Sequence, residues 1–258
     1  MKEKAKELGE GILRSGIITW ILIFAIWWIA SLFTKPSFLP SPLVSFLGLK
    51  ELAGSGKLWE HVSISLQRIA FGWSRALLIG IPLGLLIGRF KVVNWLIEPF
   101  INFFRFVPAI GFLTLFLMWF GIGEESKRVL ITYAAIFPII INTIAGVNNI
   151  EPIKYQAAES IGAGRIRSFF TVTVPASVPS VLTGVRLGLS GAIISIVGAE
   201  MLAADSGIGY LIYTSRLYFR TDWIFVGIFV LGLLGFLADR ILRLSASKVL
   251  RRYGVAKA

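Results

Sequence analysis

The chain has 258 residues, of which 56% are hydrophobic and 16% are charged, whereas soluble domains are about 45–50% apolar and about 25% charged. It carries 26 Lys and Arg against 14 Asp and Glu, a net charge of +12, with no cysteine and one histidine. This composition indicates a membrane protein. It excludes a disulfide scaffold, thiolate metal sites, cysteine nucleophiles and multi-histidine metal centres.

Six segments of low charge predict membrane helices, because about 20 apolar residues span a bilayer. The first lies between Arg14 and Lys35. We predict a helix over 17–34 that is retained, since acidic residues precede it and bulky residues fill the zone where a signal peptide would be cleaved. The other five are predicted over 69–88, 106–121, 129–147, 181–203 and 223–238. The predicted fold class is therefore an all-α integral membrane protein with six transmembrane helices.

One further uncharged segment, 168–185, contains Pro175 and Pro179 and four consecutive β-branched residues. Internal prolines remove backbone donors that lipid cannot replace. We therefore predict a loop or elbow in the first half of this segment, and the start of the fifth helix only at its end.

The distribution of cations predicts the orientation, because cytoplasmic loops of membrane proteins are enriched in Lys and Arg. With the amino terminus inside, the inner segments hold 15 of the 26 cations and the outer segments hold 7. Both termini are therefore predicted to be cytoplasmic, with an amino-terminal segment over 1–16, a basic tail over 246–258 and an extracytoplasmic loop over 35–62. Since topology explains the positive charge, we expect no nucleic-acid partner.

The predicted core covers 63–245, and its long cytoplasmic loop covers 148–180. The beginning of this loop favours a short helix, with Pro152 near its start, Glu159 inside it, and Gly162 and Gly164 after it. Two interpretations fit these residues equally well. The helix either docks on a partner protein or lies on the membrane surface as an amphipathic helix.

Residues 156–176 resemble the loop of bacterial ABC-importer permeases that carries a Glu-Ala-Ala motif, a glycine and a later proline. Ala157, Ala158, Gly162 and Pro175 fall at the family spacing, while Gln156 replaces the leading glutamate and a valine precedes the proline. Similarity to the sulfonate, taurine and nitrate permeases extends over about 37–245. Its motifs lie at 71–73, 80–88, 98–99, 106–108, 119–123, 126–127, 199–201 and 206–211.

The resemblance implies a type I ABC-importer permease fold and a non-catalytic subunit in a bacterial inner membrane. Two copies would form one path for a small anion such as a sulfonate, taurine or nitrate, delivered by an extracytoplasmic substrate-binding protein. The loop helix would dock on a cytoplasmic ATPase dimer that binds ATP and Mg²⁺, so no cofactor or metal is expected in this chain. The implied coupling residues are Gln156, Ala157, Ala158, Glu159, Gly162, Ala163 and Pro175.

Charged side chains within or beside the predicted helices are candidates for the translocation path, because isolated charge is costly in lipid. They are Arg75, Arg105, Arg186 and Glu200. Alternatively, Arg186 and Glu200 reach opposite membrane surfaces, and the other two arginines pair with Glu98 or with another helix. His61 is expected at a solvated surface.

Glycines at four-residue spacing form small-residue faces at 80, 84 and 88, and again at 184 and 188. Such faces let helix backbones approach closely in lipid. The spacing is equally compatible with packing inside one subunit and with packing between two copies.

Two other functional classes fit a multi-helix membrane protein. A secondary transporter would usually show internal repeats and intramembrane carboxylates for its coupling ion, and a membrane enzyme requires clustered His, Cys or acidic residues. The sequence shows neither pattern inside its spans. Within the importer interpretation, a vitamin or pyrimidine precursor is the alternative substrate class.

Overall fold

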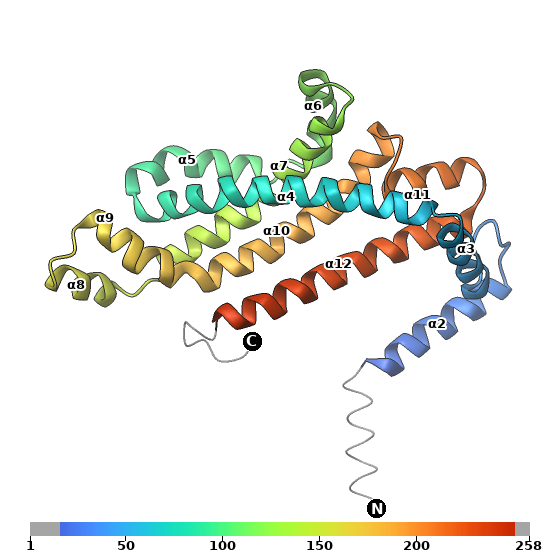
Figure 1. Ribbon diagram of the computed structural model, residues 1–258, viewed down its shortest axis with the longest axis horizontal. Coiled ribbons are helices and arrows are strands. Elements are labelled where there is room, and N and C mark those ends of the chain that lie inside the picture. Colours follow the sequence, from blue (N-terminus) through green and yellow to red (C-terminus); the bar gives the residue numbers. More distant parts are fainter. Residues whose placement is uncertain (1–15, 251–258) are drawn as a thin grey trace, which may run out of the picture. The chain divides into compact units, whose positions relative to one another are not determined.

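The computed structural model describes residues 16–250, and all secondary structure in this range is helical (Figure 1). The all-α prediction is confirmed. The described chain divides into two compact units. One comprises the residues up to Trp59 together with Leu211–Phe229, and the other comprises Glu60–Tyr210 together with the residues from Val230 onward. Most of the predicted cytoplasmic segments 1–16 and 246–258 lies outside the described residues.

The first unit contains α2 (Ile17–Leu32), α3 (Pro42–Gly54), most of α11 (Ile208–Leu217) and the start of α12 (Thr221–Leu250). Helix α3 occupies the middle of the predicted loop 35–62. It begins where the Ser41 hydroxyl accepts a hydrogen bond from the Val44 N–H at 3.3 Å, and Pro42 fills the first turn.

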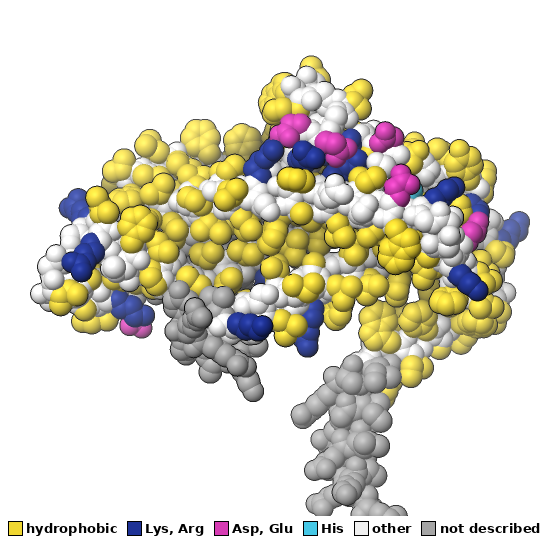
Figure 2. Space-filling view, in the orientation of Figure 1, with side chains coloured by type: hydrophobic (Ala, Val, Ile, Leu, Met, Phe, Trp, Pro, Cys, Tyr) yellow, Lys and Arg dark blue, Asp and Glu magenta, His cyan; other side chains and the backbone are white. Residues whose placement is uncertain are grey.

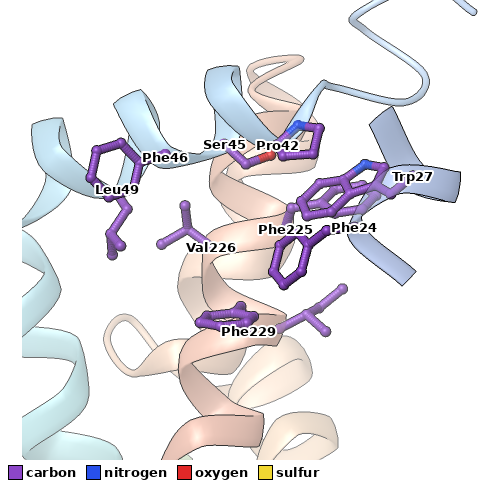
Figure 3. A pocket seen from close by; sticks show the side chains of 10 residues that line it. Phe24, Trp27, Pro42, Ser45, Phe46, Leu49, Phe225, Val226 and Phe229 are labelled. Carbon is purple, nitrogen blue, oxygen red and sulfur yellow. The ribbon is translucent and has the colours of Figure 1, made fainter. Parts of the chain in front are cut away.

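Aromatic packing joins the helices of this first unit. Trp27 of α2 stacks on Phe225 of α12 with a centroid distance of 5.3 Å, and its indole N–H donates to the Pro40 carbonyl at 2.9 Å. These helices and α3 line a hydrophobic pocket of about 280 Å³, in which Trp27 and Phe225 overlap (Figure 3).

The second unit contains most of α4 (Lys57–Arg89) and the second part of α12. Between them come α5 (Lys91–Phe104), the 3₁₀ turn η1 (Ala109–Phe112), α6 (Leu113–Phe120), α7 (Glu124–Asn148), α8 (Pro152–Ser160), α9 (Arg165–Ser168), the π-helical turn η2 (Phe169–Thr173) and α10 (Val174–Ala203).

Among residues 16–250, four helices are long and apolar enough to cross a membrane: α4, α7, the continuous helix Arg165–Ala203, and α12. The shorter apolar helix α2 occupies the place of the first predicted span. Hydrophobic side chains cover most of the face seen in Figure 2, as expected for surfaces that contact lipid. The helix that contains the second span begins at Lys57 instead of 69. In this added part, His61 and Arg68 find hydrogen-bond partners inside the protein.

The third span, predicted over 106–121, corresponds to the η1–α6 segment Ala109–Phe120. This segment is long and apolar enough to cross a membrane only together with α5, and the two are bent by 93° at a short break. The break contains Pro108, which lacks a backbone N–H and disfavours a helical conformation at Val107.

The prediction of a loop in the first half of 168–185 is wrong, because the chain is helical from Arg165 to Ala203. In a regular α-helix the ring of Pro175 would collide with the Thr171 carbonyl. The chain avoids this collision by widening the preceding turn into a π-helix, in which the Val174 N–H donates to the Phe169 carbonyl.

Glycines of α4 and α10 pack against α7 within the second unit. A Cβ added at Gly80, Gly84 or Gly88 would lie 2.6–3.0 Å from a side chain of α7, and the offset in sequence between partners is constant, as expected for parallel helices. From α10, Gly184 and Gly188 also approach α7 closely, near Ile139. These glycine faces therefore mediate packing inside one chain, which the sequence could not decide.

Candidate functional site

The break between α5 and η1 interrupts the regular α-helical hydrogen bonds, and the Phe104 carbonyl accepts instead from the Val107 N–H at 3.0 Å. The Tyr133 hydroxyl of α7 donates to the Phe104 carbonyl at 2.7 Å and lies 3.4 Å from the Val107 carbonyl. In lipid, non-helical backbone is tolerated only where protein covers it or where it lines a cavity. This break meets both conditions.

A cavity of about 430 Å³ lies at the break. Its walls come from the break itself, from α7 and from the glycine-containing face of α10. They are lined by Arg105, Val107, Pro108, Ala109, Ile110, Tyr133, Ala134, Phe137, Pro138, Gly191, Ile194, Ser195 and Gly198. Of the described residues in this lining, Arg105 alone is charged, and its guanidinium lies 4.6 Å from the centre of the Phe106 ring. A cation among apolar walls favours a small anion as the occupant.

The other predicted path residues have charged partners on neighbouring helices. Arg75 of α4 pairs with Glu125 of α7 at 2.5 Å, and Arg186 of α10 pairs with Asp239 of α12 at 2.8 Å. Of the two alternatives for Arg75, the ion pair with another helix is therefore the one observed. Glu98 accepts a hydrogen bond from Asn94 within its own helix instead.

Glu200 does not reach an outer surface, as one alternative expected, but is completely buried. Its carboxylate accepts hydrogen bonds from Arg68 Nη1 at 2.8 Å, from the Ser65 hydroxyl at 2.8 Å and from the Gly209 N–H at 2.8 Å. The chain can wrap this carboxylate because position 207 is a glycine with φ +112°, where a Cβ would collide with the Glu200 carboxyl group.

Arg68, which is 2% exposed, joins Glu200 to the beginning of α7. Its Nε and Nη2 donate to the two carboxylate oxygens of Glu124 at 2.7 and 2.6 Å. Acidic and basic side chains lie next to each other below α6 in Figure 2. We call Arg68, Glu124, Glu200 and Ser65 the buried ion cluster. It joins α4, α7 and α10, and sequence reasoning did not identify Arg68 as its centre.

His61 is partly buried, so its predicted place at a solvated surface is wrong. Its Nδ1 accepts a hydrogen bond from the Gly207 N–H at 3.1 Å. The segment 200–209 contains a glutamate, a serine and two glycines, which predicts a turn rich in backbone donors but not the burial of Glu200 or the contact with His61.

Helix α8 carries most of the predicted coupling residues. Ala158, at 7% exposure, is its single buried residue, whereas Gln156, Ala157 and Glu159 are exposed. Ala158 therefore packs against its own chain, and the coupling role implied for these residues stays a prediction.

The end of α8 is a Schellman motif. The Ala163 N–H donates to the Ala158 carbonyl at 3.0 Å, and the Gly162 N–H donates to the Glu159 carbonyl at 2.9 Å. Gly162 has φ +79°, which favours glycine. Its role in the structure is thus to end the helix, and the space beside it is open. Pro175 lies in the first turn of α10, after the π-helical turn.

A broken helix pair that lines a cavity, together with a short exposed helix between two long apolar helices, is the arrangement expected of a membrane transport subunit. The comparisons with known proteins agree. The family described as "Binding-protein-dependent transport system inner membrane component" matches residues 80–251. The chain belongs to this family, which confirms the resemblance. It is a multi-pass inner-membrane permease subunit of an ABC importer and not an enzyme.

Two relatives and one solved structure illustrate this membership. The taurine transport system permease protein TauC of Escherichia coli is 36% identical, over 87% of this chain and 84% of its own length. The aliphatic sulfonates transport permease protein SsuC of Bacillus subtilis, itself described as putative, is 33% identical over 92% and 86%. An inward-facing structure of the MetNI methionine ABC transporter matches with a TM-score of 0.59 and 19% identity. The match covers 70% of this chain and 92% of that chain, and it confirms the type I importer fold.

Proposed function

We propose that two copies of this chain form the path for a small anion, with organosulfonates such as taurine as the first class and nitrate as a smaller relative. The observation that carries this proposal is Arg105, which is the single charged side chain among the described residues that line the cavity at the broken span. The relatives named for taurine and aliphatic sulfonates support the same class. Arg75, Arg186 and Glu200 then serve mainly to pair helices.

The proposal includes the partners. A substrate-binding protein delivers the solute from outside, and a cytoplasmic ATPase dimer binds ATP and Mg²⁺. Helix α8 docks on this ATPase through its exposed residues Gln156, Ala157 and Glu159. This arrangement requires both termini of the chain to be cytoplasmic, which the excess of inner cations supports.

Uptake into proteoliposomes that contain the whole complex tests the substrate class. Labelled taurine, methanesulfonate and nitrate are the probes, and Arg105→Gln is compared with Arg105→Lys. We expect Arg105→Gln to lower uptake about 10-fold or more, since a hydrogen bond to a charged group contributes about 1.5–3 kcal/mol. Arg105→Lys keeps the charge and retains more activity. Equal uptake by both variants, or no uptake of any probe by the wild type, would overturn the assignment.

Site-directed crosslinking tests the docking of α8. The chain has no cysteine, so a single Ala157→Cys substitution can carry a benzophenone maleimide. We expect an adduct with the ATPase from position 157, which is exposed. Ala158→Cys is the matched control one residue away, where the side chain faces the protein interior. Absence of an adduct at 157, or equal adducts at both positions, contradicts the docking face.

A further inference from the structure

Among the described side chains of α8, Tyr155 is the one that makes polar and ring contacts with the membrane helices. Its hydroxyl is hydrogen bonded to the Thr173 hydroxyl at 3.0 Å. Its ring lies under the Arg89 guanidinium, 4.4 Å from the ring centre. Among the described residues, no other side chain of α8 makes a hydrogen bond, ion pair or ring contact with another helix.

We propose that Tyr155 is the positioning residue through which a displacement of α8 reaches α4 and α10. This inference rests on the proposed docking of α8 on the ATPase. It adds a residue that lies just before the coupling residues implied by the family resemblance and is not one of them.

The rest of α8 is weakly attached to the second unit. Ala158 is its single buried residue, and the Schellman motif at its end bonds the helix only to its own next residues. A cleft of about 500 Å³ lies beside the helix, lined by Tyr155, Gln156 and Glu159 and by Arg89 and Lys91 at the turn between α4 and α5. The cleft leaves room for α8 to move relative to that turn. Because Tyr155 contacts Arg89 and Thr173 across this space, a movement of α8 pulls on both of these residues.

The two partners of Tyr155 lie at the ends of long membrane helices. Thr173 is fully buried and ends the π-helical turn that leads into α10, and π-helical turns are frequent at functional sites. Arg89 is the last residue of α4. Since α4 and α10 both pack on α7 through glycines, a force applied at Tyr155 acts on all three helices.

A mutant cycle in the complete reconstituted complex tests the inference. Tyr155→Phe removes the hydroxyl and keeps the ring under Arg89, while Thr173→Val removes the partner hydroxyl and keeps the shape. The measurement is the number of solute molecules imported per ATP hydrolysed, with the best imported of the three probe anions. We expect each variant to lower this ratio about 2- to 10-fold, the range that one hydrogen bond contributes. The double variant should be no worse than either single one.

Controls separate transmission from a merely structural role. Ser160→Ala removes a hydroxyl of α8 that bonds only within the helix, so it should leave the ratio of solute imported to ATP hydrolysed unchanged. Thr173→Ser keeps the hydroxyl that bonds to Tyr155 and should therefore keep the wild-type ratio. An unchanged ratio in Tyr155→Phe, or a loss of the crosslink from position 157 in that variant, overturns the inference. If the crosslink from position 157 is absent in the wild type, the docking proposal itself fails.

Discussion

The buried ion cluster makes a strong prediction about stability. Arg68→Met removes a side chain that is 2% exposed and leaves Glu200 with no cation in a fully buried site. The carboxylate must then stay charged without a partner or take up a proton, and both are unfavourable. Breaking a buried pair by removing one partner costs about 3–5 kcal/mol.

Glu124→Gln provides the comparison, because the side chain of Glu124 is 44% exposed. Water solvates that end of the cluster, so the loss of its charge should cost about 0.2–1 kcal/mol. For a chain of this size, about 1 kcal/mol corresponds to a shift in Tm of about 2–4 °C. We therefore expect Tm to fall by roughly 6–20 °C in Arg68→Met and by no more than about 4 °C in Glu124→Gln.

Thermal unfolding of the purified chain in one detergent measures both shifts. The variant Arg68→Met with Glu200→Gln removes the unpaired charge and should recover part of the loss, because the two sites are in direct contact. Similar shifts in Arg68→Met and Glu124→Gln, or a fully additive double variant, would refute the reasoning that burial governs this cluster.

Three further predictions concern a packing contact, a surface ion pair and a helix end. Gly84→Ala should lower the free energy of unfolding by about 1–3 kcal/mol, because its Cβ would lie 2.6 Å from Thr143. Thermal unfolding measures this loss. The control Gly232→Ala should not destabilise the protein, since there is open space around Gly232. The Arg220 guanidinium lowers the pKa of Glu51 below its ordinary value of 4.5, so this stabilisation is present above that pH and is lost as pH falls through the lowered pKa. The difference in Tm between wild type and Glu51→Gln should therefore vanish in acid, and a constant difference contradicts the pairing. Gly162→Ala should speed hydrogen exchange at the amides that close the Schellman motif by roughly 5–30-fold, since φ +79° costs an L-residue about 1–2 kcal/mol, whereas Gly164→Ala, at an ordinary φ of −66°, should not.

Composition and uncharged segments were sufficient to predict the helical class, the family and the position of α8, since these depend on local patterns. The breaks in the helices were harder to predict. Pro108 and Pro175 each lack a backbone N–H. Pro108 nevertheless lies in a break between two helical segments, whereas Pro175 follows a widened turn inside a continuous helix. The difference depends on what packs around each proline, and that is decided by residues far away in the sequence, such as Tyr133.

Whether a charged residue lines the cavity or forms an ion pair depends on partners that are far away in the sequence. Arg105 and Arg75 look alike in sequence, because each lies in an apolar segment. They differ only because Glu125 comes within reach of Arg75 when α4 packs on α7. For the same reason the sequence offered no way to choose between an exposed and a buried Glu200.

The π-helical turn at Phe169–Thr173 ties the length of this segment to Pro175. Such a turn holds one residue more than an α-helical turn. Deleting any one of these five residues would return the helix to regular geometry, in which the ring of Pro175 collides with the carbonyl four residues before it. The extra residue and the proline should therefore occur together, and a relative without the proline needs no widened turn here.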